Sequence, residues 1–255
     1  MIDVYWLEQT ATEVRHEDDW LSARELGLLD HLHIPKRNAD WRLGRWTAKR
    51  ALAVYLDLPD QPRVFANIEV IAGDSGAPEV FFANRNDVAA ISLSHRTDSA
   101  MCAIAGRGTA LGCDLEVIEP HSDNFVADFF TLGEQELIAS VPETDRPLLV
   151  TLLWSAKEST LKALHVGLRL DTRSVSVDPG KLLDRESVAG IDSKLRTSEC
   201  SCGSDSWQPL QTRFDDGQVF HGWWQRDGSL LRTLVSSPAP KRPMLLQLAA
   251  EISAP

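Results

Sequence analysis

The order of helical and strand-like segments constrains the fold of this chain more than any other feature. After an opening strand, helical patterns lie over about residues 18–31 and 39–56, and strand-like patterns run from residue 67 to residue 117. Helical patterns return over residues 124–165, and strand-like patterns follow from 174 to 236. Separate runs of helices and strands are typical of α+β proteins. We therefore predict an α+β fold of two similar halves, each with helices packed on antiparallel meander sheets, and a cleft between them.

The two runs meet near Gly112, although no residue-level repeat relates them. We place an N-terminal half at residues 1–111 and a C-terminal half at residues 112–236. Residues 237–255 are rich in Ala and Pro, and we expect them to form a peripheral tail with a short helix. Within the N-terminal half we expect Pro35 to end the first helix, because proline disfavours a helix interior.

The charge and hydropathy of the chain exclude two classes of partner. The net charge is −11 over 255 residues, whereas nucleic-acid binding needs a basic face. The N-terminus lacks the basic start and apolar run of a signal peptide, and no apolar stretch approaches the ~20 residues that span a bilayer. We expect a cytoplasmic protein with neither a nucleic-acid nor a membrane partner.

Basic residues are nevertheless concentrated in one helical segment. Six of the 26 lie within fifteen positions, with Asp40 the only acid among them: Lys36, Arg37, Arg42, Arg45, Lys49 and Arg50. Three of these, Arg42, Arg45 and Lys49, have the spacing of one helix face. Such a concentration indicates an anionic ligand of limited size, and the alternative is an ordinary solvated helix face.

Asp114 and Glu116 form a candidate metal site. On a strand, side chains at positions i and i+2 share one face, so both carboxylates project together while Cys113 turns to the core. Two adjacent carboxylates repel each other unless a cation lies between them, and Mg²⁺ prefers such oxygen ligands. The alternative is an edge strand with two solvated acids.

Glu158 and Lys162 form a candidate reaction centre. Together with Trp154 they lie at positions i, i+4 and i+8, and therefore along one face of a helix. Glu158 can act as a third metal ligand or as a general base, and Lys162 can face a phosphate. Taken alone, this pair is more often a surface salt bridge.

Ser94 and His95 close a strand and are followed by Arg96. Hydroxyl, imidazole and guanidinium groups at a strand end can hold a phosphate through charge-assisted hydrogen bonds. An ordinary turn is the alternative. A serine hydrolase is disfavoured, since no Gly-x-Ser-x-Gly elbow is present.

In this order the motifs resemble the surfactin-synthetase-activating type of 4′-phosphopantetheinyl transferase. The motifs are Ser94-His95, Gly112-Cys113-Asp114-Leu115-Glu116, Phe129-Phe130 with Glu134, and Trp154-Ser155-Ala156-Lys157-Glu158 with Lys162. The stretch Gly44-Arg45 with Lys49-Arg50-Ala51-Leu52 also resembles a helix of that family. The resemblance covers about residues 41–167.

The resemblance implies a pseudo-twofold monomer that binds coenzyme A in the cleft between its halves. It implies the activity of a holo-acyl-carrier-protein synthase: transfer of 4′-phosphopantetheine from coenzyme A to a serine of an apo acyl, peptidyl or aryl carrier protein. The products are holo-carrier protein and adenosine 3′,5′-bisphosphate. By position, Asp114, Glu116 and Glu158 would hold Mg²⁺, or Mn²⁺ in its place. Glu158 would help to deprotonate the serine, and Lys162 would neutralise or protonate the leaving group.

The resemblance also implies a set of phosphate- and nucleotide-binding residues, namely Arg45, Lys49, Ser94, His95 and Lys157. One departure stands out. Family members often carry Gly-Lys-Pro, whose lysine reaches the 3′-phosphate, and this chain has Gly76-Ala77-Pro78. We expect Arg45 or Arg42 to take the role of that lysine.

Two other readings compete with the transferase. One is a non-catalytic module with the same fold that binds coenzyme A or a carrier protein, and the other is an unrelated Mg²⁺ phosphotransferase or nuclease. The presence of Asp114, Glu116, Glu158 and Lys162 together argues against loss of activity. The carrier stays open among fatty-acid, polyketide, peptide-synthetase and lysine-pathway proteins, and we expect it to dock on apolar residues around 125–130.

Overall fold

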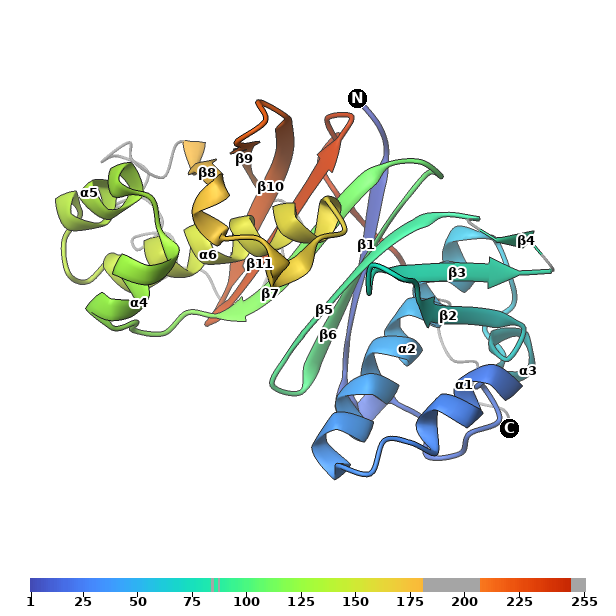
Figure 1. Cartoon of the computed structure of the whole chain (residues 1–255). Helices are drawn as coiled ribbons and strands as arrows, with labels where there is room; N and C mark the ends of the chain where they lie inside the picture. Colours follow the sequence, from blue (N-terminus) through green and yellow to red (C-terminus); the bar gives the residue numbers. More distant parts are fainter. Residues whose placement is uncertain (84, 87, 181–206, 249–255) are drawn as a thin grey trace, which may run out of the picture.

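The structure is a computed structural model that describes residues 1–83, 85–86, 88–180 and 207–248 (Figure 1). It is a mixed α+β fold, as the sequence predicts. The first part of the chain contains β1 (Val4–Thr10), α1 (Ala23–Leu29), α2 (Pro35–Tyr55), α3 (Pro62–Phe65), β2 (Ile68–Ala72), β3 (Pro78–Phe82), β4 (Arg85–Asn86), β5 (Ala90–Arg96) and β6 (Ser99–Ala105). The second part contains β7 (Ala110–Val117), α4 (Asp123–Phe129), α5 (Leu132–Ser140), α6 (Arg146–Ala163), β8 (Val175–Asp178), β9 (Gln208–Phe214), β10 (Val219–Asp227), β11 (Leu230–Ser237) and β12 (Met244–Leu245).

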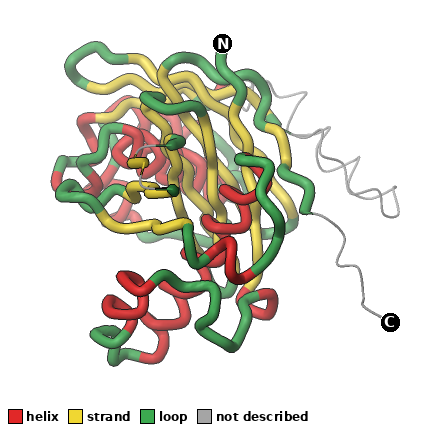
Figure 2. Tube along the Cα trace, turned by 90° about the vertical axis from the view of Figure 1, so that its right-hand side faces the viewer, coloured by secondary structure: helices red, strands yellow, loops and turns green. Residues whose placement is uncertain are grey.

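Three sheets carry these helices. Their strand orders are β12-β1-β6-β5, β7-β11-β10-β9-β8 and β2-β3-β4, and all neighbours are antiparallel except the parallel pair β1–β12. The long helix α2 packs on β1, β5 and β6, and α6 packs on β7 and β11. Figure 2 shows the strands running through the middle of the molecule, with most helices on its outside. None of the described helices is both long and apolar enough to cross a membrane.

The two larger sheets meet along β5 and β7. The backbone N–H of Cys113 on β7 donates to Ser92 Oγ on β5 at 2.9 Å. Behind this contact lies an apolar cluster drawn from β1, β6, β7 and β11, which includes Trp6, Cys113 and Leu234. Cys113 is therefore a core residue, as expected. The join between the sheets is buried, and it holds the polar ends of β5 and β7 beside one another.

The helix starts differ from the sequence prediction. α1 begins after Ser22, whose Oγ accepts from the N–H of Glu25, and the Glu25 carboxylate accepts from the N–H of Ser22 in return. This capping box fixes the start four residues after Asp18. Pro35 does not end a helix but begins α2, because the first turn of a helix needs no N–H from the residue there.

The tail also differs from its prediction. Its described residues, 237–248, contain no helix but form the strand β12, whose Met244 pairs with Tyr5 of β1; residues 249–255 lie outside the described part of the chain. The N–H of Leu246 donates to the carbonyl of Trp6 at 2.8 Å. The tail thus adds an edge strand to a sheet from the first part of the chain.

Candidate active site

Ser94, Asp114 and Lys162 meet in the structure although they come from β5, β7 and α6. Asp114 Oδ1 accepts from Ser94 Oγ at 2.8 Å and from Lys162 Nζ at 2.8 Å. Lys162 also donates to the carbonyl of Cys113 at 3.1 Å. Asp114 is almost fully buried, whereas 26% of the Lys162 side chain is exposed. The ammonium group of Lys162 is thus fixed at the edge of the join between the sheets.

Gly112 allows β7 and α6 to come this close. A Cβ at position 112 would lie 1.7 Å from the carbonyl oxygen of Ser159, which is a backbone atom of α6 and cannot move aside. The glycine lies two residues before Asp114, and Ser159 follows Glu158 directly. The missing side chain therefore sets the distance between the strand and the helix that carry the predicted catalytic residues.

Glu116 lies two positions beyond Asp114 on β7 and is held from two sides. Trp154 Nε1 on α6 donates to Glu116 Oε1 at 3.2 Å, and Arg96 Nε lies 3.1 Å from Glu116 Oε2. Trp154 packs edge-on against Phe125 and Phe129 of α4, with ring centroids 5.1 and 5.2 Å apart. The aromatic cluster thus positions the indole N–H that orients Glu116.

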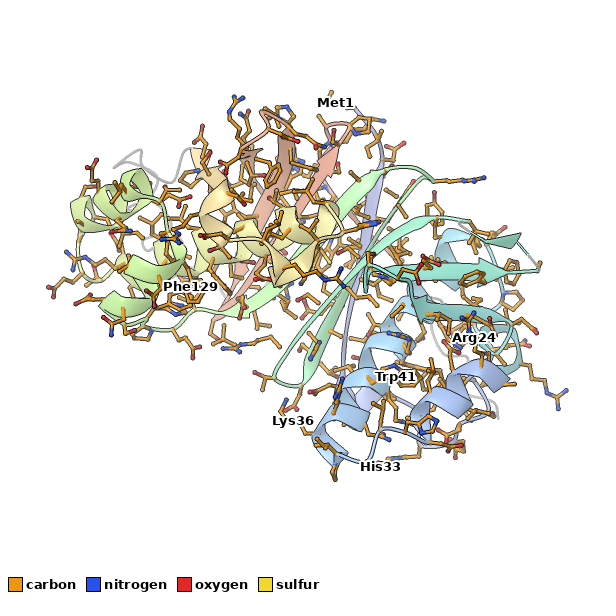
Figure 3. The ribbon with its side chains drawn as sticks, in the orientation of Figure 1. Met1, Arg24, His33, Lys36, Trp41 and Phe129 are labelled. Atoms are coloured by element: carbon orange, nitrogen blue, oxygen red, sulfur yellow. The ribbon has the colours of Figure 1, made fainter. Side chains whose placement is uncertain are left out.

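The same cluster changes the expectation for residues 125–130. Phe130 is fully buried, and Phe125 and Phe129 are half-buried against Trp154. Phe129, labelled in Figure 3, lies on α4. Part of the apolar surface expected for docking a carrier therefore packs against Trp154 of α6.

The carboxylates raise one another's proton affinity. Burial raises the pKa of Glu158 to about 7, and the negative charge of Asp114 adds to this effect while Lys162 opposes it. The pKa of Glu116 is also raised, by burial and then by Asp114. Burial is the largest influence on the pKa of Lys162 and lowers it, but Asp114, Cys113 and Glu158 together outweigh burial, so the net pKa is raised. The site holds more negative charge than its own cations neutralise.

Two carboxylate oxygens of this site have no hydrogen-bond partner. Asp114 Oδ2 and Glu158 Oε1 are both buried and unpaired within the described part of the chain. Buried acceptors without donors are costly, and a divalent cation is a partner that both could share. As they stand, however, no three His, Cys, Asp or Glu side chains among the described residues are grouped to hold a metal ion.

A cavity of about 500 Å³ gathers several of the predicted phosphate-binding residues. It is lined by the first half of α2 and the end of β5, including Lys36, Arg37, Arg45, Ser94 and His95. Lys36 and Trp41 are labelled on α2 in Figure 3. The guanidinium of Arg45 lies 5.0 Å from the centre of the Trp41 ring, and its Nε is buried without a partner in the described chain. This cavity is basic and is adjacent to Ser94, which links it to Asp114.

Three cations predicted to bind phosphate point elsewhere. Arg42 contacts Asp18 and donates to the carbonyls of Arg15 and His16, so it fixes the loop before α1. Lys49 and Lys157 lie in the cores of the two parts of the chain, fully buried. None of these three side chains is among the residues that line the basic cavity, because each is held by acceptors elsewhere.

The surroundings of Lys49 explain its burial. Its Nζ donates to the carbonyls of Trp20 and Phe65 at 3.0 and 3.1 Å and contacts Glu25 Oε2. Glu25 Oε1 accepts from the N–H of Val70 on β2 at 3.1 Å. Burial lowers the pKa of Lys49, and Glu25 partly restores it. The pair ties α1, α2 and β2 together.

Lys157 has matching surroundings. Its Nζ lies 2.8 Å from Glu134 Oε2, donates to the carbonyl of Thr172 at 3.0 Å and contacts the carbonyl of Val175. Glu134 Oε1 accepts from the N–H of Val177 on β8 at 3.1 Å. Glu134 is also the last residue of a capping box that starts α5. The pair ties α5, α6 and β8 together, next to Glu158.

A second cavity, of about 540 Å³, lies between the two parts of the chain. Its lining comes from β3, the starts of β5 and β7, the turn before β7 and the residues that end α6, including Pro78, Ile91 and His165. Pro78 directly follows Ala77, where the family lysine is missing. Position 77, where the lysine is missing, is therefore next to a residue that lines a cavity between the two parts of the chain.

One contact of the site does not follow from the sequence. The sequence groups Arg96 with Ser94 and His95 as a possible phosphate ligand, whereas the structure pairs Arg96 with Glu116 and with Glu119. The only local signal is the position of Arg96 at the strand end, and nothing local indicates which acid lies opposite.

Comparisons with known proteins agree with these motifs. Residues 110–196 match a family model described as the 4′-phosphopantetheinyl transferase superfamily. The chain is 27% identical over 179 residues to the 4′-phosphopantetheinyl transferase HetI of Nostoc sp., covering 68% of this chain and 72% of that protein. It is 31% identical over 84 residues to the holo-acyl-carrier-protein synthases of Streptococcus agalactiae serotypes III and V, covering 33% of this chain and 71% of theirs. The chain belongs to the 4′-phosphopantetheinyl transferase superfamily.

Proposed function

We propose that this protein transfers the 4′-phosphopantetheine group of coenzyme A to a serine of an apo carrier protein, in a Mg²⁺-dependent reaction. The observation that carries the proposal is the meeting of Ser94, Asp114 and Lys162 beside Glu116 and Glu158. These side chains come from three distant segments and occupy the positions of the family motifs. The products are holo-carrier protein and adenosine 3′,5′-bisphosphate.

The carboxylates suit a divalent cation. Asp114 and Glu158 each offer a buried oxygen without a partner, and Glu116 would serve as a third ligand. Mg²⁺ commonly takes one or two protein carboxylates and completes its shell with water and phosphate oxygens. When bound, it supplies positive charge to the pyrophosphate oxygens and lowers the cost of the charge that develops there.

Glu158 and Lys162 divide the proton transfer between them. The serine oxygen forms a bond to the β-phosphorus, and the bond from phosphorus to the bridging oxygen breaks. Glu158 accepts the serine proton directly or through water, as a carboxylate within short reach of the nucleophile can. Lys162 neutralises or protonates the leaving oxygen of adenosine 3′,5′-bisphosphate. Such phosphoryl transfer depends mostly on positioning and charge.

The basic cavity on α2 would hold the nucleotide end of coenzyme A. Arg45, Ser94 and His95 line it together with Lys36 and Arg37. Of the two cations considered as a replacement for the lysine missing at position 77, we assign the 3′-phosphate to Arg45, since Arg42 is bound to the loop at Asp18. An unpaired Nε in a partly buried guanidinium favours an anionic ligand.

We also propose that residues 1–111 and 112–236 are two halves related by a pseudo-twofold, acting as one monomer. The support is the matched pair of buried clusters, each a capping-box glutamate, a lysine from the long helix and a strand N–H. When the two clusters are aligned, α1 corresponds to α5, α2 to α6 and β2 to β8. On this alignment Arg50, which follows Lys49, occupies the place of Glu158, which follows Lys157. A native mass spectrum that showed only dimers would contradict the monomer.

The test is a mass measurement on carrier proteins. The protein is incubated with coenzyme A, Mg²⁺ and each of several apo carriers, and each carrier is weighed by mass spectrometry. We expect one carrier to gain the phosphopantetheine mass, and Glu158→Gln to lose about 10²–10⁴-fold in rate, the usual contribution of a general base. Binding of coenzyme A without any mass gain would instead support a non-catalytic binding module.

A further inference from the structure

Arg96 is a cation of the site to which the proposed reaction assigns no role. It is the last residue of β5, two positions after Ser94, and 41% of its side chain is exposed. Its Nε lies 3.1 Å from Glu116 Oε2, and one of its terminal nitrogens lies 2.7 Å from Glu119 Oε1. The guanidinium therefore bridges two carboxylates, one at the centre of the site and one at its rim.

Glu116 differs from the other two carboxylates in this respect. Asp114 Oδ2 and Glu158 Oε1 are unpaired within the described chain, whereas both oxygens of Glu116 have a donor, Trp154 on one and Arg96 on the other. The indole contact is neutral and can persist beside a metal ion. The guanidinium of Arg96, in contrast, places a full positive charge beside Glu116 Oε2, the oxygen that a metal ion would approach.

Glu119 offers Arg96 a second position. Nearly half of the Glu119 side chain is exposed, and its contact with Arg96 is the shorter of the two. An arginine side chain is long, and its planar group can keep one carboxylate while leaving another. If Arg96 moved away from Glu116, it would lose that ion pair and keep the one with Glu119.

We propose that Arg96 is a resident counter-cation of the site, which the divalent metal displaces from Glu116 and which Glu119 then retains. The inference rests on the proposed function, because it takes Asp114, Glu116 and Glu158 as the metal ligands. In the metal-free protein, Arg96 neutralises part of the negative charge at Glu116. The metal must compete with it, so Arg96 lowers the affinity of the free protein for divalent cations.

The test measures metal binding directly and needs no activity. Mn²⁺ replaces Mg²⁺ at oxygen sites, and its free concentration is read from the electron paramagnetic resonance signal in a titration without coenzyme A. We expect Arg96→Gln to tighten Mn²⁺ binding about two- to fivefold, the range that corresponds to the worth of an exposed ion pair. Arg173→Gln is the matched control, because it removes the same charge from an exposed pair with Asp171. It should leave the dissociation constant unchanged.

A double-mutant cycle tests the role of Glu119. Glu119→Gln should weaken Mn²⁺ binding in the wild-type background and leave it unchanged in the Arg96→Gln background. Equal Mn²⁺ affinity for the wild type and Arg96→Gln, or weaker binding by Arg96→Gln, overturns the proposal. The variant Asp114→Asn distinguishes an error in the proposed metal site from an error in the role of Arg96. If it binds Mn²⁺ as the wild type does, the proposed metal site is wrong, and if it loses binding while Arg96→Gln has no effect, only the role of Arg96 is wrong.

Discussion

Glu158 should make the metal-free protein less stable as the pH rises through neutrality. Its pKa in the folded protein is about 7, against 4.5 for an unperturbed glutamate, because burial and Asp114 disfavour the charged form. Each tenfold change in proton affinity is worth about 1.4 kcal/mol, so ionising Glu158 in the folded protein costs about 3 kcal/mol more than in the unfolded chain. Since the folded state binds the proton more tightly, the stabilisation is complete below about pH 4.5 and is lost as the pH rises through 7.

The substitution Glu158→Gln removes this titration while keeping the size of the side chain. Urea unfolding of both proteins with a metal chelator present should give similar free energies of unfolding near pH 4.5, after allowing for a constant offset. At pH 8 the variant should be more stable by about 3 kcal/mol relative to that offset. Adding Mg²⁺ should reduce the difference at pH 8, because a bound cation favours the ionised carboxylate of the wild type.

The pH dependence of the difference decides the outcome. If the free energies of the two proteins differ by the same amount at pH 4.5 and pH 8, Glu158 does not carry a raised pKa and the reasoning from burial is refuted. Asp171→Asn is a useful control, since Asp171 is an exposed acid paired with Arg173 outside the site. It should show no such change of stability between pH 5 and pH 8.

Three further substitutions test the surroundings of the site. Lys157→Met leaves the buried Glu134 carboxylate without its cation and should lower the free energy of unfolding by about 3–5 kcal/mol in urea titrations, with part regained in the double variant with Glu134→Gln. Gly112→Ala should lower both the melting temperature and the transfer rate because strand and helix must separate, whereas Gly133→Ala in α5, which meets no atom within 4 Å, should lower neither. Arg45→Gln should raise KM for coenzyme A about tenfold, with kcat retained; with 3′-dephospho-coenzyme A as substrate the variant and wild type should have equal KM, and an unequal KM would remove Arg45 from the 3′-phosphate.

The parts of the site that follow from local periodicity could be predicted from the sequence. Asp114 and Glu116 share a strand face, and Glu158 and Lys162 share a helix face, because each spacing matches the repeat of its own element. The structure adds the contacts between these elements, such as Lys162 with Asp114.

Long-range partners could not be read from the sequence. A lysine on a basic helix face looks the same whether it meets solvent or a buried glutamate, and the partner of Lys49 lies 24 residues away. The same holds for Arg42, whose acceptors lie in a loop before α1. The strand β12 could not be predicted, because its pairing with β1 joins segments almost 240 residues apart, which no local pattern records.

This pairing has a consequence for how the chain folds during synthesis. Tyr5 of β1 pairs with Met244 of the parallel strand β12. The carboxylate of Glu8, also on β1, accepts hydrogen bonds from the guanidinium of Arg232. At the usual 5–20 residues per second, the ribosome reaches these partners about 10–50 s after it has made β1. Until then the outer edge of β1 is an unpaired strand edge, which invites pairing with other chains. A tag or truncation placed near residue 244 therefore alters the sheet that contains β1, although β1 lies near the other end of the sequence.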